Sequence, residues 1–124
     1  QLERLAGEHI RFVGFVEDDE LVEWYRGARA LIFPSEEDFG MVAAEALTYG
    51  TPVIGLHYGG LQEIVTEETG EFFESNAPEI IAEGVRRFLE KEGAYDRVLM
   101  QETAKRFSAE HFKNEMKRIV EQVR

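Results

Sequence analysis

Two short apolar runs constrain the fold of this chain most: ALIFP at residues 30–34 and PVIGL at residues 52–56. A run without polar alternation is typical of a strand that is covered on both faces, as in a parallel sheet. Strong helix formers separate the two runs, in MVAAEALTYG at 41–50, and Gly50 suits the C-terminal end of that helix. The two runs are therefore predicted to be parallel strands joined by a helical crossover.

The same alternation continues on both sides of this unit. IRFVGFV at 10–16 predicts a buried strand interrupted at Gly14, and DELVEWYRGAR at 19–29 predicts a helix with one apolar face. After the second run, LQEIV at 61–65 predicts a short helix and GEFFE at 70–74 a brief strand. The order β-α-β-α-β-α-β predicts an α/β domain with a Rossmann-like, three-layer fold: a parallel sheet with helices on both faces.

The pattern becomes entirely helical in residues 77–124. Helical spacing of apolar residues predicts one helix from Pro78 and two more at 95–106 and 108–123. The last helix carries an apolar stripe of Phe112, Met116, Ile119, Val120 and Val123. With 124 residues, the chain is predicted to be a single domain, with its sheet in about 10–74 and extra helices after it.

The composition argues against several kinds of chemistry. A formal net charge of -11 opposes nonspecific binding to nucleic acid, so no nucleic-acid partner is expected. There is no cysteine, and the three histidines lack ligand spacing, so neither a disulfide nor a metal site is expected. No apolar run approaches the roughly 18 residues that a membrane-spanning helix needs, which predicts a soluble chain.

An acidic loop, SEEDFG at 35–40, joins the first apolar run to the following helix. The start of that helix would offer free backbone N–H groups of Gly40, Met41 and Val42 to an anion. Glu45 lies in the apolar part of the helix, where a buried carboxylate needs a hydrogen-bond partner. Sugar or ribose hydroxyls would satisfy it, and so would an exposed or internally paired position, so both alternatives remain open.

The order of these segments resembles a known family. PSEEDFGMVAAEALTYGTPVIG, followed by GGLQEIV and GEF, is similar to the nucleotide-sugar-binding domain of the retaining family 4 glycosyltransferases, which have the GT-B fold. The similarity extends from Ile10 to Phe112 and includes FVGFV, ARALIFPS and a late RFSAEHF. Glu37 and Glu45 have the E-x(7)-E spacing of that family.

The resemblance implies a role for each matching residue. Glu37 is expected to be the catalytic residue, hydrogen-bonding hydroxyls of the donor sugar, and Glu45 is expected to hold the ribose hydroxyls. The turn from Gly14 to Val16 corresponds to the nucleobase site. The backbone expected to meet the sugar and diphosphate is that of Phe39, Gly40, Met41 and Val42.

The family also implies a reaction. Its members transfer a sugar from a nucleoside-diphosphate sugar to an acceptor hydroxyl, with retention of configuration and without a metal or other cofactor. The acids that precede Phe39 and Gly40 are similar to those of mannosyltransferases, so GDP-mannose is the expected donor, with UDP-sugars as the alternative. The expected partners are this donor and a glycan or lipid acceptor, in the cytoplasm or at the inner face of the membrane.

Only part of the two-domain architecture of the family has a counterpart in this sequence. The acceptor domain, two strands of the donor domain and the loop that supplies Arg and Lys to the diphosphate have no match before Gln1. The chain is therefore expected to be a truncated half of the donor-binding domain, inactive alone. Residues 10–16 are expected to pair directly with residues 30–34, or the open edge to form a dimer. The alternative function is a non-catalytic Rossmann-like binding or assembly module.

Three further side chains near these motifs carry weaker expectations. His57 follows the run at 52–56 and is expected in a solvent-facing loop, the alternative being contact with a donor phosphate or sugar. Trp24 and Tyr25 are expected in the core rather than as stacking platforms for a base.

Overall fold

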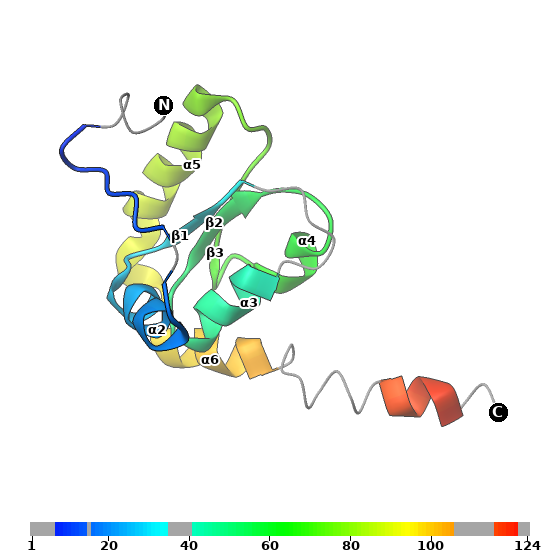
Figure 1. The fold of residues 1–124 in the computed structure, drawn as a ribbon. Coiled ribbons are helices and arrows are strands. Elements are labelled where there is room, and N and C mark those ends of the chain that lie inside the picture. Colours follow the sequence, from blue (N-terminus) through cyan, green and yellow to red (C-terminus); the bar gives the residue numbers. More distant parts are fainter. Residues whose placement is uncertain (1–6, 15, 35–40, 106–115, 122–124) are drawn as a thin grey trace.

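The computed structural model describes residues 7–14, 16–34, 41–105 and 116–121 (Figure 1). In this described part, three parallel strands form one sheet in the order β1-β2-β3. The strands are β1 (Leu31–Phe33), β2 (Val53–Leu56) and β3 (Gly70–Phe73). They coincide with three of the four predicted strands, and all three run parallel, as predicted.

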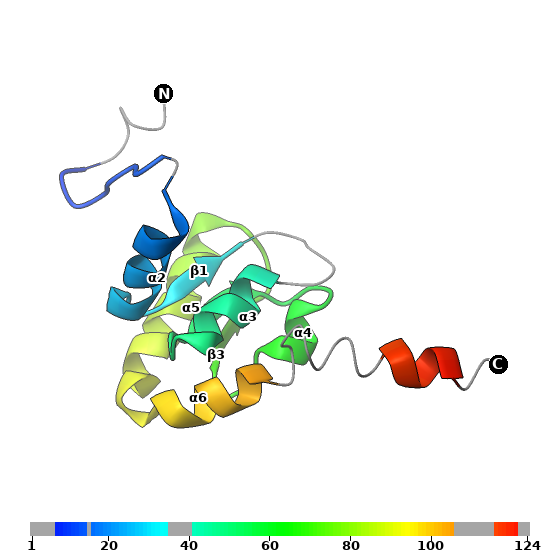
Figure 2. The same cartoon turned by 60° about the horizontal axis from the view of Figure 1, so that its bottom comes forward.

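Helices cover both faces of the sheet (Figures 1 and 2). They are α2 (Asp18–Gly27), α3 (Met41–Thr48), α4 (Leu61–Ile64), α5 (Pro78–Lys91), a 3-10 helix at Glu92–Ala94, and α6 (Arg97–Ala104). Helices α2, α3, α4 and α6 contribute side chains to the hydrophobic cluster on one face, whereas α5 packs on the other. The predicted three-layer α/β architecture is confirmed.

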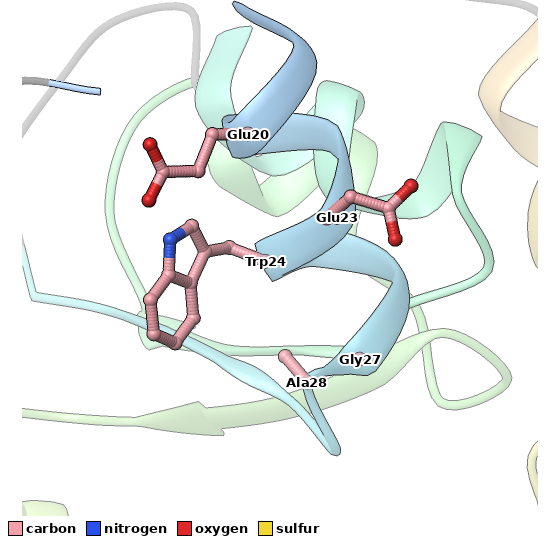
Figure 3. A pocket seen from close by; sticks show the side chains of 5 residues that line it. All are labelled: Glu20, Glu23, Trp24, Gly27 and Ala28. Carbon is pink, nitrogen blue, oxygen red and sulfur yellow. The ribbon is translucent and has the colours of Figure 1, made fainter. Parts of the chain in front are cut away.

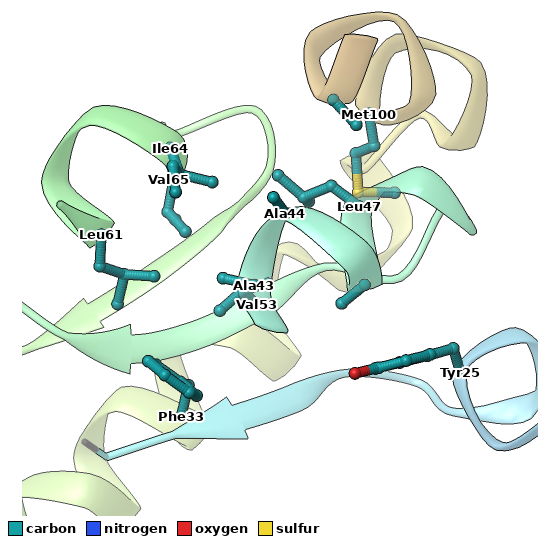
Figure 4. Packing of buried hydrophobic residues seen from close by; sticks show 12 residues of the cluster. Tyr25, Phe33, Ala43, Ala44, Leu47, Val53, Leu61, Ile64, Val65 and Met100 are labelled. Carbon is teal, nitrogen blue, oxygen red and sulfur yellow. The ribbon is translucent and has the colours of Figure 1, made fainter. Parts of the chain in front are cut away.

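Strand β2 separates two hydrophobic clusters, because successive side chains of a strand point to opposite faces. Val53 belongs to the cluster on one face, to which α3, α4 and α6 also contribute side chains (Figure 4). Ile54 and Leu56 pack with Phe73 and Phe88 on the face that α5 covers. These five side chains are all buried. Both faces of the central strand are therefore covered, which explains why its sequence is continuously apolar.

Two helix ends show how local sequence fixes the crossovers. Gly50 has φ 75°, and its N–H donates to the carbonyl of Leu47 at 2.9 Å, while the N–H of Thr51 donates to Ala46 at 3.0 Å. This is the left-handed cap predicted for Gly50, which a side chain would strain. Asp96 caps the start of α6, because its carboxylate accepts the N–H groups of the second and third helical residues.

The predicted strand at 10–16 is wrong. Residues 10–14 and 16 contain no strand, and the Phe12 side chain is 52% exposed rather than buried. Among the described residues β1 pairs only with β2, so direct pairing of 10–16 with β1 is also wrong, and the sheet begins at Leu31. An extended segment without a neighbouring strand has no ladder of hydrogen bonds to hold it. Pairing of the open β1 edge with a second copy stays a prediction.

The last predicted helix, at 108–123, lies only partly within the described residues. Residues 116–121 form a helix, and all are exposed, including Met116, Ile119 and Val120 of the predicted stripe. In Figures 1 and 2 this helix lies apart from the sheet and its covering helices. Phe112 and Val123 lie outside the described residues. Within the described part, no helix combines the length and the apolar character needed to cross a membrane.

Candidate functional site

The predicted site lies where parallel strands end and lead into helices, the usual place for ligands in this class of sheet. Strand β1 precedes α3, β2 precedes α4 and β3 precedes α5, so these connections share one edge of the sheet (Figure 1). Glu37, Phe39 and Gly40 lie outside the described residues. Met41 is the first residue of α3, the helix whose N-terminus was predicted to meet an anion.

Glu45 is exposed, which is one of the positions that the sequence left open for it. Exposed residues recur every three positions along α3, at Val42, Glu45 and Thr48. This spacing places them on one outward stripe of the helix. The opposite stripe is buried and consists of Ala43, Ala44, Ala46 and Leu47. The small side chains of the buried stripe give the segment its apolar composition, although one face of the helix meets solvent.

The Glu45 carboxylate lies beside Tyr25, a buried tyrosine of α2. Tyr25 is 8% exposed, and its ring stacks on Tyr49 with centroids 5.8 Å apart. Burial raises the pKa of Tyr25, and the negative charge of Glu45 and its hydrogen bond with the Tyr25 hydroxyl raise it further. The hydroxyl thus stays protonated as a donor, and Glu45 is paired internally while remaining open to solvent.

Sequence reasoning placed Tyr25 in the core and missed its partner. The signal that could have found it is the choice of tyrosine over phenylalanine, since a buried hydroxyl usually finds a hydrogen-bond partner. The two residues lie 20 positions apart in the chain, on different helices, and no motif joins them.

Two residues of the turn predicted to meet a nucleobase, Gly14 and Val16, lie within the described part of the chain. Gly14 is exposed with φ 63°, a conformation that favours glycine, and Val16 is half-buried just before α2. Gly14 therefore has a left-handed backbone conformation at the predicted position. The role of Gly14 and Val16 in binding a base stays a prediction.

A pocket of about 280 Å³ lies beyond the carboxyl ends of β2 and β3. We call it the β2–β3 pocket. The residues that line it are Leu56, His57, Tyr58, Glu74, Ser75 and Asn76. The Nδ1 atom of His57 lies 3.1 and 3.2 Å from the two carboxylate oxygens of Glu74. The expected solvent-facing position of His57 is confirmed, but its pairing with Glu74 was not foreseen, because the two follow different strands.

A second pocket, of about 550 Å³, lies along the outward side of α2 and is lined by Glu20, Glu23, Trp24, Gly27 and Ala28 (Figure 3). Trp24 is 41% exposed, so its expected core position is wrong. The guanidinium of Arg11 lies 5.6 Å from the centre of its ring, a cation–π distance. All the lining residues belong to one helix and its C-cap, away from the strand ends where the predicted site lies.

Charged side chains anchor β3 to α5 beneath the β2–β3 pocket. Glu71 lies 3.1 Å from Arg87 Nε and 2.6 Å from Lys91 Nζ, and Arg87 also donates to the carbonyl of Phe72 at 2.7 Å. Burial alone would raise the pKa of Glu71, but hydrogen bonds from Lys91 and Arg87 outweigh it and lower that pKa below 4.5. The described residues contain no group of three or more acidic or histidine side chains that could hold a metal ion.

Comparison with known proteins places this geometry in a family. The family of glycosyl transferases group 1 matches residues 1–113. The D-inositol 3-phosphate glycosyltransferase of Nocardioides sp. is 37% identical over 110 residues, which cover 86% of this chain and 24% of that protein. The enzyme of the same name from Corynebacterium urealyticum is 34% identical over 128 residues, covering 97% of this chain and 30% of its own length.

A solved structure is similar over nearly the whole chain. Sucrose-phosphate synthase from Thermosynechococcus elongatus superposes with a TM-score of 0.78 at 32% identity, covering 98% of this chain and 32% of that one. The chain thus spans about a quarter to a third of the length of these relatives. The chain belongs to the glycosyl transferases group 1 family, and its three-stranded α/β fold matches part of a GT-B domain.

Proposed function

We propose that this chain is part of the donor-binding domain of a glycosyltransferase that moves a sugar from a nucleoside-diphosphate sugar to an acceptor hydroxyl. Family membership supports sugar transfer as the general reaction. The observation that carries the proposal is the position of Glu45, whose carboxylate is open to solvent on α3 and lies beside Tyr25. A carboxylate with free acceptor capacity suits paired ribose hydroxyls.

The remaining residue roles complete this proposal. Glu37 binds hydroxyls of the donor sugar as the catalytic residue, and the backbone from Phe39 to Val42 meets the sugar and diphosphate. Gly14 and Val16 flank the nucleobase. The exposed stripe that holds Val42 and Glu45 supports a ligand along α3, because both side chains face outward from the same helix.

The finer features of the reaction are proposals as well. Transfer proceeds with retention, without a metal or other cofactor, and GDP-mannose is the first donor to test, with UDP-sugars second. The acceptor is a glycan or a lipid, reached through a further domain in the cytoplasm or at the inner membrane face. Two of the matching relatives are named D-inositol 3-phosphate glycosyltransferase, which makes a phosphorylated cyclitol a further acceptor to test.

One observation favours the alternative of a non-catalytic binding module. Ile32 on the open edge of β1 is 48% exposed, and Phe12 and Val13 are exposed beside the start of α2. Exposed apolar groups near an open strand edge are typical of association sites. In this alternative the fold mediates assembly and the α3 stripe binds no nucleotide.

Calorimetric titration with GDP and UDP separates the two functions. The donor-binding proposal predicts saturable binding of at least one nucleotide and a loss of about tenfold in affinity for Glu45→Gln, since a charged hydrogen bond contributes about 1.5 kcal/mol or more. Glu90→Gln is the matched control, because Glu90 is exposed on α5 across the sheet. Identical finite affinity of wild type and Glu45→Gln would contradict the ribose role, and no binding would favour the alternative.

A further inference from the structure

The β2–β3 pocket is not used by the proposed nucleotide site. Among the residues that the structure describes, none that lines this pocket belongs to α3. It nevertheless lies at the carboxyl edge of the same sheet, the edge at which parallel α/β folds place their ligands. Its position therefore suits a ligand.

The backbone of two neighbouring strands fixes the shape of this pocket. Leu56 and Phe73 are opposite residues at the ends of β2 and β3, and the N–H of His57 donates to the Phe73 carbonyl at 2.9 Å. This bond extends the parallel ladder one residue beyond the strand. The chain then diverges into two loops, one of which carries Tyr58 and the other Glu74.

The imidazole of His57 is held from two sides. Its Nδ1 atom meets the Glu74 carboxylate at 3.1 Å, and its ring lies 4.7 Å from the Phe72 ring. This pairing fixes the orientation of the imidazole. The Glu74 carboxylate, which is largely exposed, retains further acceptor positions.

The other polar groups of the pocket are neutral. Tyr58 contributes a hydroxyl and Asn76 an amide, and neither side chain hydrogen-bonds another group within the described part of the chain. Ser75 adds a second hydroxyl, which accepts the N–H of Ala77. No lysine or arginine is among the pocket's described lining residues, and the charge of Glu74 opposes a phosphate. Neutral donors and acceptors around one carboxylate suit vicinal hydroxyl groups.

The size of the pocket limits the ligand further. Its volume of about 280 Å³ is close to the lower end of about 300 Å³ for small-molecule sites. A single six-membered ring with hydroxyl groups is of this scale, whereas a whole nucleotide sugar needs a larger site. The rings of Tyr58 and His57 would offer apolar surface to the C–H face of such a ring.

We propose that the β2–β3 pocket binds one neutral hydroxyl-bearing ring, a sugar residue or a cyclitol, in a subsite separate from the nucleotide site on α3. Glu74 and Asn76 bind its hydroxyl groups, and His57 positions the Glu74 carboxylate. The role of this subsite rests on the proposed function: in a glycosyltransferase, the bound ring is part of either the donor sugar or the acceptor.

The test is a titration of the isotopically labelled 124-residue chain with mannose, glucose and myo-inositol, followed by two-dimensional amide NMR. At least one ring should produce saturable shifts of the amides of His57, Tyr58 and Asn76. Glu74→Gln and Asn76→Ala should each weaken binding about tenfold, with otherwise unchanged spectra because both residues are exposed. Glu67→Gln is the control, since Glu67 is exposed and precedes β3 at the opposite edge of the sheet.

Two results would overturn the proposal: no saturable shift at these amides with any of the three rings, or equal affinity of wild type and both pocket variants. Adding GDP-mannose identifies the source of the ring. Joint shifts at the pocket and at Val42 to Glu45 indicate the donor sugar, whereas a free ring that still binds in the pocket beside saturating GDP-mannose indicates the acceptor. Failure of nucleotide binding with intact ring binding would reject the donor-binding function and leave the subsite standing.

Discussion

Strand β2 and residues 10–16 have similar apolar, β-branched sequences but opposite environments. Val53 and Ile54 of β2 are fully buried, whereas Phe12 is 52% exposed and the residues around it contain no strand. Strand β2 has a hydrogen-bonded strand on each side and helices on both faces. The segment at 10–16 has no strand partner among the described residues. Apolar content therefore indicates that a segment can be a strand, and its neighbours decide whether it becomes one.

The largest effect expected from this comparison is the contrast between two phenylalanines. Phe73→Ala should lower the free energy of unfolding by about 3–5 kcal/mol, because the ring is fully buried between β2 and α5. Phe12→Ala should change it by no more than about 0.5 kcal/mol, as is usual for exposed positions. Urea unfolding followed by circular dichroism measures both. Equal losses would mean that residues 10–16 are packed in solution.

A smaller but sharper effect is expected where β3 begins. Gly70→Ala should lower the free energy of unfolding by about 2–3 kcal/mol, because an added Cβ would overlap the backbone carbonyl of Val53 in β2. The control is Gly93→Ala, whose Cβ would meet no atom within 4 Å. Comparison of the two urea midpoints tests this prediction. A Gly70→Ala protein as stable as the control would show that the two strands do not approach as closely as the structure places them.

The parts of the fold that were predicted correctly depend on local patterns. The three strands, helix α3 with its cap at Gly50, and helix α5 beginning at Pro78 follow from runs and spacings within about 15 residues. The error at 10–16 has a different origin, because the sequence of one segment does not show whether another strand pairs with it. Ladder formation depends on segments that are distant in sequence, which periodicity cannot report.

The candidate site was predicted less completely than the fold for the same reason. The E-x(7)-E spacing selected Glu45. The apolar composition of the segment did not reveal that exposed residues recur every three positions and that Glu45 is one of them. Its contact with Tyr25 joins two helices, and the contact of His57 with Glu74 joins the ends of two strands. Such contacts arise from the register of the sheet and the packing of helices on it, and no local motif encodes them.

A further prediction concerns α6, which contributes Met100 and Ala104 to the hydrophobic cluster that contains Val53. Asp96→Ala should lower the free energy of unfolding by about 1 kcal/mol, because the Asp96 carboxylate accepts the N–H groups of Val98 and Leu99 at the start of α6. Asp19→Ala in the first turn of α2 is the control, and it should lower the free energy of unfolding by only about 0.3 kcal/mol. Thermal unfolding of both variants distinguishes a cap from a general charge effect, and equal shifts would argue against the cap.

The smallest effect expected is on the pH dependence of stability. The comparison is between Glu71, which is paired with Lys91 and Arg87 between β3 and α5, and Glu92, which is paired with Arg29 at the surface. Because Lys91 and Arg87 lower the Glu71 pKa below 4.5, this carboxylate stabilises the folded chain above about pH 4.5. That contribution is lost as the pH falls through the lowered pKa of the folded state. Glu92, paired with Arg29 at the protein surface, also has a lowered pKa, but water and salt screen that pair more strongly.

Glu71→Gln should therefore flatten the acid limb of the stability profile more than Glu92→Gln does. The measurement is the urea midpoint of wild type and both variants between pH 3 and pH 7 at constant ionic strength. Added salt should reduce the Glu92 contribution first, because the Glu71 side chain is only 15% exposed between β3 and α5. If both variants shifted the limb equally and with the same salt dependence, the anchoring of β3 by this cluster would be no stronger than an ordinary surface ion pair.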